Sequence, residues 1–211
     1  MKVVKIGIGA AVLALAAWSG GVALSQDKDK KDPAAEMQEA MEAAMKPGPS
    51  HKYLMDEVGE WDVAGKMYFD ATHPAECKGT SKLRAIFGGR YLVEETDSVC
   101  NPGPDGKPAP FHGMGTFGYD NVKKKYVASW VDDMGTGILA MEGDCDGKTL
   151  TEEGPMEIPG LGTTTFRIKS THVDADHMTL EGWQVIPASV PLPEGAPHEM
   201  KAMELHYTRK K

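Results

Sequence analysis

Ten short strand-like segments follow one another after Val58, and no helix-like segment interrupts them. Turn residues such as Gly88-Gly89 and Asp146-Gly147 separate the segments. A sheet of this many antiparallel strands tends to curl and close, because closure removes its exposed edges. We therefore expect an all-β fold over residues 59–211, an antiparallel up-and-down barrel of eight to ten strands, with a β-sandwich as the alternative. The expected strands are residues 61–70, 76–87, 90–100, 111–119, 124–133, 137–145, 148–156, 162–173, 177–186 and 199–208.

Residues 33–58 precede the expected barrel and predict one or two short helices. Good helix formers fill residues 33–46, with Pro33 near the start and a Pro-Gly-Pro stop behind. Ser50 could cap a second helix over residues 51–58. Three methionines fall on one face of the first helix, and this stripe either packs on the body of its own domain or forms a lid or partner-binding face. They are Met37, Met41 and Met45.

Residues 1–25 have the pattern of a secretory signal peptide. A basic start precedes an uncharged apolar run over residues 6–17, and the small residues Ala23 and Ser25 suit a cleavage site. The run is shorter than the roughly 20 residues that a spanning helix needs, and no cysteine follows the cut to accept a lipid. We expect cleavage before Gln26, export to the periplasm or the medium, and a disordered charged tether over residues 26–32; an uncleaved N-terminal anchor is the alternative.

The charge balance argues against nucleic acid as a partner. The chain has 23 Lys and Arg against 31 Asp and Glu, a formal net charge of −8. Loss of residues 1–25, which hold two lysines and no acids, takes this charge to −10. Such a surface repels a phosphate backbone. The sequence leaves the oligomeric state open.

Three cysteines in an exported chain allow one disulfide and leave one thiol over. The segment from Ile86 to Tyr91 predicts a hairpin with a Gly-Gly loop, and counting outward along both strands places Cys77 opposite Cys100. Direct opposition across an antiparallel pair is compatible with disulfide geometry. We expect a Cys77–Cys100 disulfide, with a pairing that includes Cys145 as the alternative. Acidic neighbours disfavour a reactive thiolate at Cys145, which we interpret as a bystander.

A short motif at the start of the first strand resembles a known signature. Gly59-Glu60-Trp61 is similar to the Gly-x-Trp signature of the calycin superfamily of lipocalin-like barrels. Arg209 is placed like the arginine that packs over that tryptophan. A ring at a barrel end gains from a guanidinium stacked on its face, so we expect structural roles for Trp61 and Arg209.

A longer stretch, residues 118–137, resembles the bacterial domain-of-unknown-function family numbered 1579. It has that family's Gly-Tyr-Asp-Asn turn, Lys-Tyr strand and Trp-x-Asp-x-Met-x-Thr-Gly segment. Pro-Gly-Pro-x-His at 47–51, Gly-Gly-Arg at 88–90 and Tyr-Thr-Arg-Lys at 207–210 also fit, so the resemblance covers about residues 36–210. It implies a calycin-like barrel. The family has no established activity, so the resemblance leaves the function open.

No local signature predicts a catalytic set or a cofactor. Gly113-x-Gly115-x-x-Gly118 fits a dinucleotide pattern, but no helix follows to hold a phosphate, and the glycines are better explained by a bend in the strand or by close approach of another element. We expect no metal and no cofactor, and whether the protein is an enzyme stays open.

The histidines are candidate ligands for a metal ion or for haem. His172 and His177 flank Asp174 and Asp176 across a turn, which is either a solvated acidic turn or a weak surface metal site. Haem is not expected, because the covalent attachment motif is absent and His206 falls on the expected solvent face.

A barrel of this size can enclose a small ligand. We expect Trp130 to supply an apolar wall and Asp132 an orienting acceptor; the alternative is a core tryptophan and a carboxylate bonded to a turn. Either face of the strand expected at residues 124–133 could point inward.

The favoured function is binding of a small apolar ligand. The alternatives are an enzyme that uses the same cavity, or a filled barrel that acts as a structural or interaction module. Pro-rich segments 101–110 and 187–197 could shape the mouth. The candidate ligand-binding residues are Trp130, Asp132, Met134, His112, Met114 and Trp183.

Overall fold

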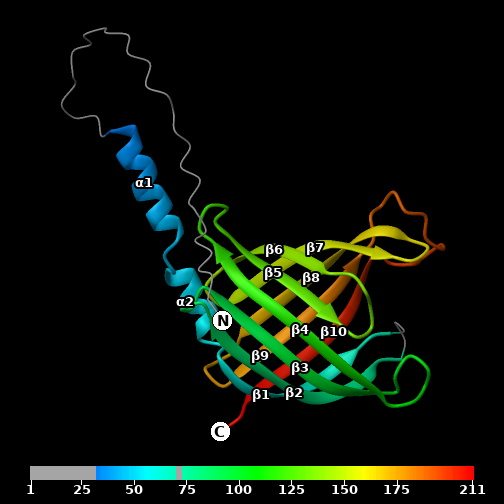
Figure 1. Cartoon of the computed structure of the whole chain (residues 1–211). Coiled ribbons are helices and arrows are strands. Elements are labelled where there is room, and N and C mark those ends of the chain that lie inside the picture. Colours follow the sequence, from blue (N-terminus) through cyan, green and yellow to red (C-terminus); the bar gives the residue numbers. More distant parts are fainter. Residues whose placement is uncertain (1–31, 70–72) are drawn as a thin grey trace, which may run out of the picture.

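Ten strands form one closed antiparallel barrel in the computed structural model, which describes residues 32–69 and 73–211 (Figure 1). Each strand pairs with its sequence neighbours, and the first pairs with the last, so the expected up-and-down barrel is confirmed. The expected signal peptide and most of the expected tether lie outside the described residues. The strands are β1 (Gly59–Met67), β2 (Ala75–Ile86), β3 (Tyr91–Asn101), β4 (Ala109–Asp120), β5 (Lys125–Asp132), β6 (Leu139–Cys145), β7 (Thr149–Ile158), β8 (Gly162–His172), β9 (His177–Val185) and β10 (Glu199–Arg209).

Side chains alternate between the lumen and the outer surface along each strand. In β1, Trp61 and Val63 are buried while Asp62 between them is exposed. The face of β5 that the sequence left ambiguous is now assigned. Tyr126 and Ala128 are buried, and Trp130 shares their parity and lines the lumen.

The hairpin of β2 and β3 has the register expected from its loop. Ile86 lies opposite Tyr91, and the pairing continues without a bulge to Cys77 opposite Cys100. These two cysteines form the disulfide, with 4.0 Å between their Cα atoms, so the expected pairing is confirmed. Cys145 is free and half-buried.

Two helices precede the barrel in the part of the chain that the structure describes, α1 (Pro33–Ala44) and α2 (Pro49–Met55). The second begins two residues earlier than expected, because Gly48 is its N-cap and Pro49 occupies its first position. The Gly48 N–H donates to His51 Nδ1 at 3.0 Å, which replaces the predicted cap by Ser50. Neither helix in the described part of the chain has the length and apolar character needed to cross a membrane.

Helix α1 projects away from the barrel (Figure 1). None of its residues is buried, and Met37, Met41 and Met45 are each about 60% exposed, so the expectation that the stripe packs on its own domain is wrong. Hydrogen bonds tie the end of α1 to the barrel. Arg90 Nη2 donates to the Met45 carbonyl at 2.9 Å, and Asn121 Nδ2 donates to the carbonyls of Ala44 and Lys46.

Helix α2 closes one end of the barrel and packs its Leu54 into the main hydrophobic core. Trp61 is fully buried in that core and its Nε1 donates to the Glu57 carbonyl at 2.9 Å. The Arg209 guanidinium lies over the Trp61 ring, 4.1 Å from its centroid. It also donates to the carbonyls of Val58 at 2.7 Å and Asp56 at 2.8 Å. Arg209 therefore joins the last strand to the linker behind α2.

The opposite end of the barrel carries the long connections. Both Pro-rich segments lie there, between β3 and β4 and between β9 and β10, together with the connection from β5 to β6 (Figure 1). We call this end the mouth and the end covered by α2 the closed end.

Removing the disulfide should destabilise the barrel, because it closes a loop with a sequence separation of 23. We expect the double variant Cys77→Ala/Cys100→Ala to lose about 3 kcal/mol of unfolding free energy in urea. Cys145→Ala is the control and should change stability far less. Equal stability of the double variant and the unmodified protein would contradict the role of this bond.

Arg209→Ala should lose about 2–4 kcal/mol of unfolding free energy, since it removes the cation–π contact and several hydrogen bonds to backbone carbonyls. Arg209→Lys keeps the charge but not the planar fork, so an intermediate loss is expected. Urea unfolding followed by tryptophan fluorescence measures both. A loss below about 0.5 kcal/mol in the alanine variant would rule out a locking role for this side chain.

Candidate functional site

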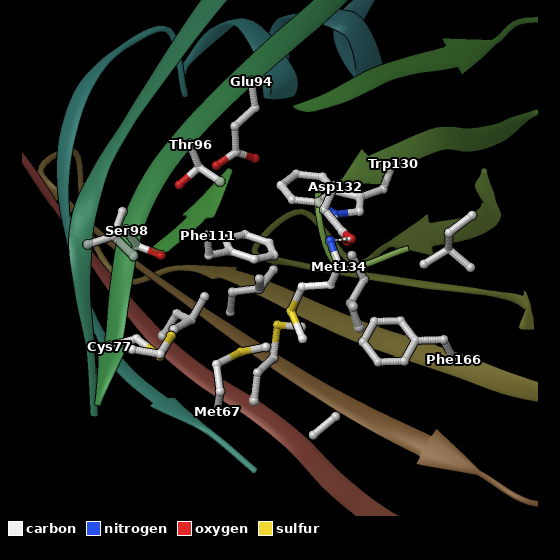
Figure 2. Close-up of a pocket in the computed structure, with 18 of the residues that line it drawn as sticks. Met67, Cys77, Glu94, Thr96, Ser98, Phe111, Trp130, Asp132, Met134 and Phe166 are labelled. Atoms are coloured by element: carbon white, nitrogen blue, oxygen red, sulfur yellow. Dashed lines mark hydrogen bonds between the residues drawn. A yellow bond between two sulfur atoms is a disulfide. The ribbon is translucent and has the colours of Figure 1, made fainter. Parts of the chain in front are cut away.

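The lumen contains a cavity of about 260 Å³ that extends toward the mouth (Figure 2). Its wall is mostly apolar and includes side chains from almost every strand. Five of the lining residues are methionines, whose unbranched, polarizable side chains adapt to irregular shapes. They are Met67, Met134, Met141, Met156 and Met203.

Trp130 forms one wall of the cavity because the neighbouring strand carries glycines beneath its ring. A Cβ atom at Gly113 would lie 2.4 Å from Trp130 Cζ2, and one at Gly115 would lie 2.9 Å from Cε3. These glycines permit close approach of the ring, as the sequence analysis proposed, and the phosphate-binding interpretation has no support. Any larger residue at either position would displace Trp130.

Asp132 holds Trp130 and the turn that follows β5. Trp130 Nε1 donates to Asp132 Oδ2 at 3.0 Å, and the Met134 N–H donates to Oδ1 at 3.0 Å. Both carboxylate oxygens therefore have partners within the protein. Asp132 lines the cavity, as the ligand-binding interpretation of the sequence requires, and it also bonds a turn, as the alternative interpretation requires.

The structure brings together three of the six candidate ligand-binding residues, Trp130, Asp132 and Met134, in the cavity wall (Figure 2). The other three do not line it. His112 and Met114 have the opposite parity to the lumen-facing residues of β4, and both are exposed. Trp183 lies on the outer face of β9, beneath the ammonium groups of Lys169 and Lys201.

A polar stripe runs along β3 on the otherwise apolar wall. Ser98, Thr96 and Glu94 follow one another into the barrel (Figure 2). Glu94 Oε1 accepts hydrogen bonds from Ser81 Oγ at 2.6 Å and Tyr207 Oη at 3.2 Å. Burial raises the pKa of Glu94 to about 7, against the opposing effect of the bond from Ser81. A buried carboxyl group that titrates near neutrality thus lies at the inner end of the cavity.

A second carboxyl group lies deeper in the barrel. Glu152 on β7 is only 1% exposed, and its Oε1 has no hydrogen-bond partner among the residues that the structure describes. Burial and then the charge of Glu57 raise its pKa to about 8. Glu94 and Glu152 were not among the site residues predicted from the sequence. The available signal was the position of each on the apolar face of its strand, two residues after Leu92 and Leu150 respectively.

The histidines and acids of the turn between β8 and β9 do not converge. His172 Nε2 lies 2.7 Å from Glu57 Oε1 at the closed end, whereas His177 Nδ1 lies 2.8 Å from Asp174 Oδ1 on the surface. Within residues 32–69 and 73–211, no group of three or more His, Cys, Asp or Glu side chains is placed to hold a metal ion.

A closed antiparallel meander with a helix over one end and an apolar cavity inside defines a lipocalin-like barrel. Within this class, the chain belongs to the family described as "Protein of unknown function (DUF1579)", whose sequence model matches residues 46–209. The resemblance found in the sequence is therefore confirmed.

Solved structures with the same architecture are distant in sequence. Rv2717c from M. tuberculosis is 15% identical, with a TM-score of 0.51 over 79% of this chain and 100% of that chain. The S-type phycobiliprotein lyase CPES from Guillardia theta is 8% identical, with a TM-score of 0.49 over 77% of this chain and 93% of that chain. None of the curated proteins matches the chain. The similarity to Rv2717c shows the fold alone.

The buried carboxyl groups predict a pH-dependent stability. The Glu152 carboxyl group holds its proton more tightly in the folded protein than in the unfolded chain, because burial raises its pKa. Its contribution to the free energy of unfolding therefore falls as pH rises from about 4.5 to about 8. Glu152→Gln should therefore gain stability relative to the unmodified protein across this range, by up to about 1.4 kcal/mol per pH unit. Urea unfolding at pH 5, 6, 7 and 8 measures the difference. Glu153→Gln, on the exposed face of the same strand, is the control, and a pH-independent difference for Glu152→Gln would contradict the assignment.

Proposed function

We propose that this protein binds a small, mostly apolar molecule in the lumen of its barrel. The observation that carries the proposal is the cavity of about 260 Å³, which a core packed for stability alone would fill. Its volume lies just below the roughly 300–1,000 Å³ typical of sites for drug-sized ligands, so a small molecule fits better than a long lipid.

The composition of the wall supports an apolar ligand with few polar groups. Methionines and the rings of Phe111, Phe117, Trp130 and Phe166 offer a deformable hydrophobic surface. The charged residues that line it are Lys78, Glu94 and Asp132, and Lys78 is exposed. Burial of apolar surface would supply most of the affinity, and the polar stripe of β3 would orient the ligand.

The mouth gives such a molecule a place to enter. Phe69 is 38% exposed and Met134 is 53% exposed, although both line the cavity. Hydrophobic side chains exposed around a concave site are a feature of binding sites. Export is part of the proposal, since the Cys77–Cys100 disulfide suits an oxidising compartment and would hold β2 to β3 beside the mouth.

The test is a calorimetric titration with 1-octanol, a small apolar probe with one hydroxyl group. Ala202 lines the lumen, so Ala202→Phe should fill part of the cavity and weaken binding by about tenfold or more. Val99→Phe adds the same ring at a position that is 48% exposed on the outer face of β3, and should leave the affinity unchanged.

Native mass spectrometry of protein taken from its producing cells gives a second readout, in which a stoichiometric adduct of low mass is expected. Absence of an adduct together with no binding of 1-octanol would contradict the proposed function. Equal weakening by both phenylalanine variants would place the site outside the lumen.

A further inference from the structure

A second, smaller cavity of about 40 Å³ lies inside the barrel toward the closed end. It is close to the space of one water molecule or one ammonium group, since a water occupies about 30 Å³ in the liquid. Three carboxylic acid residues contribute to its wall, from the linker behind α2, from β3 and from β7. They are Glu57, Glu94 and Glu152.

Two of these three acids have hydrogen-bond partners, and the third lacks a donor. Glu57 is paired with His172, and Glu94 accepts from Ser81 and Tyr207. Glu152 Oε1 is fully buried and has no hydrogen-bond partner in residues 32–69 and 73–211. Among the described residues that line the small cavity, none is a lysine, arginine or histidine. A buried carboxyl oxygen without a partner is costly, and the group that would satisfy it here must donate a hydrogen bond.

The small cavity adjoins the lumen. Glu94 lies in the wall common to both, and the polar stripe of Ser98 and Thr96 leads to it from the mouth (Figure 2). Other side chains shared by the two walls are mainly apolar and could contact the body of a ligand whose polar end reaches the acids. The residues that line both cavities are Glu94, Phe117, Ile168, Leu180 and Tyr207.

We infer that the lumen ligand carries a primary ammonium group, which binds between Glu94 and Glu152 at the inner end of the barrel while its apolar part lies against Phe117 and Leu180. An ammonium group supplies three donors and a positive charge to a pocket that holds acceptors and no cation. This inference names the ligand class for the proposed function and rests on that function.

Proton release should accompany binding. The carboxyl groups that face the site are Glu94 on β3, Glu152 on β7 and Glu57, which is paired with His172 on β8; Tyr207 on β10 completes the titratable set. Since burial raises the pKa of Glu94 to about 7 and that of Glu152 to about 8, an acid that is neutral in the empty site would ionise when the ammonium group arrives. Affinity for an amine should then rise by up to tenfold per pH unit between pH 6 and pH 7 and level off above about pH 8.

The experiment compares three probes with the same alkyl chain, n-octylamine, 1-octanol and octanoate, by calorimetry at pH 6, 7 and 8. We expect the amine to bind at least tenfold more tightly than the alcohol at pH 8, with octanoate weakest. Only the affinity for the amine should rise with pH. Glu152→Gln should abolish the preference for the amine and keep the affinity for 1-octanol, which also shows that the variant is folded. Glu153→Gln, on the outer face of β7, should keep the preference.

The failures of the two proposals are distinguishable. If 1-octanol binds but n-octylamine binds no more tightly, or if the preference survives in Glu152→Gln, the ammonium site is overturned and the proposed function stands. If octanoate binds most tightly, the inner end of the lumen prefers an anion and the ammonium site is overturned. If none of the three probes binds the folded protein, both the site and the proposed function are overturned.

Discussion

The pairing of β1 with β10 closes the sheet, and the interior of the barrel depends on that seam. Trp61 and Arg209 lie directly opposite each other across it, with the guanidinium over the indole ring. The same arginine bonds to carbonyls of the linker behind α2, so a single side chain joins the seam to the helix that covers the closed end. Once the seam is closed, every strand has two neighbours and the alternation of side chains is the same around the barrel.

The two ends of the lumen have different physical properties. At the mouth, Trp130 lies against the glycine backbone of β4 and its nitrogen is bonded to Asp132, which fixes one wall. Methionines complete this region and give it a surface that can adapt. At the inner end, Glu94 and Glu152 are buried among apolar side chains, where their ionised forms are disfavoured. A buried carboxyl oxygen that has no partner among the described residues, as at Glu152, reduces stability, which supports the binding role proposed for this residue over a packing role.

Much of the fold was predictable because it depends on local patterns. Turn residues separated the ten strands, and the Gly88-Gly89 loop fixed the register that brings Cys77 opposite Cys100. The site was harder to predict, since the face of a strand depends on its neighbours. Trp130 and Asp132 were placed by a family motif, whereas His112 and Met114 were misplaced because their strand has no strong alternation in sequence. Glu152 was not predicted, because neither β3 nor β7 carries a recognisable motif and only the closed barrel brings Glu152 and Glu94 to the same cavity. The exposure of Met37 on α1 was also unpredictable, as an amphipathic stripe does not identify its partner.

Methionine methyl groups report directly on the central claim that the lumen receives a ligand. They lie in the cavity wall, as Met67, Met141, Met156 and Met203 do, and also outside the barrel, as Met37 and Met41 do. In ¹³C-methyl methionine spectra recorded with saturating n-octylamine, we expect the lumen signals to shift and the signals from α1 to stay unchanged. Shifts confined to α1 or to the outer surface, with the lumen signals unmoved, would contradict binding in the lumen.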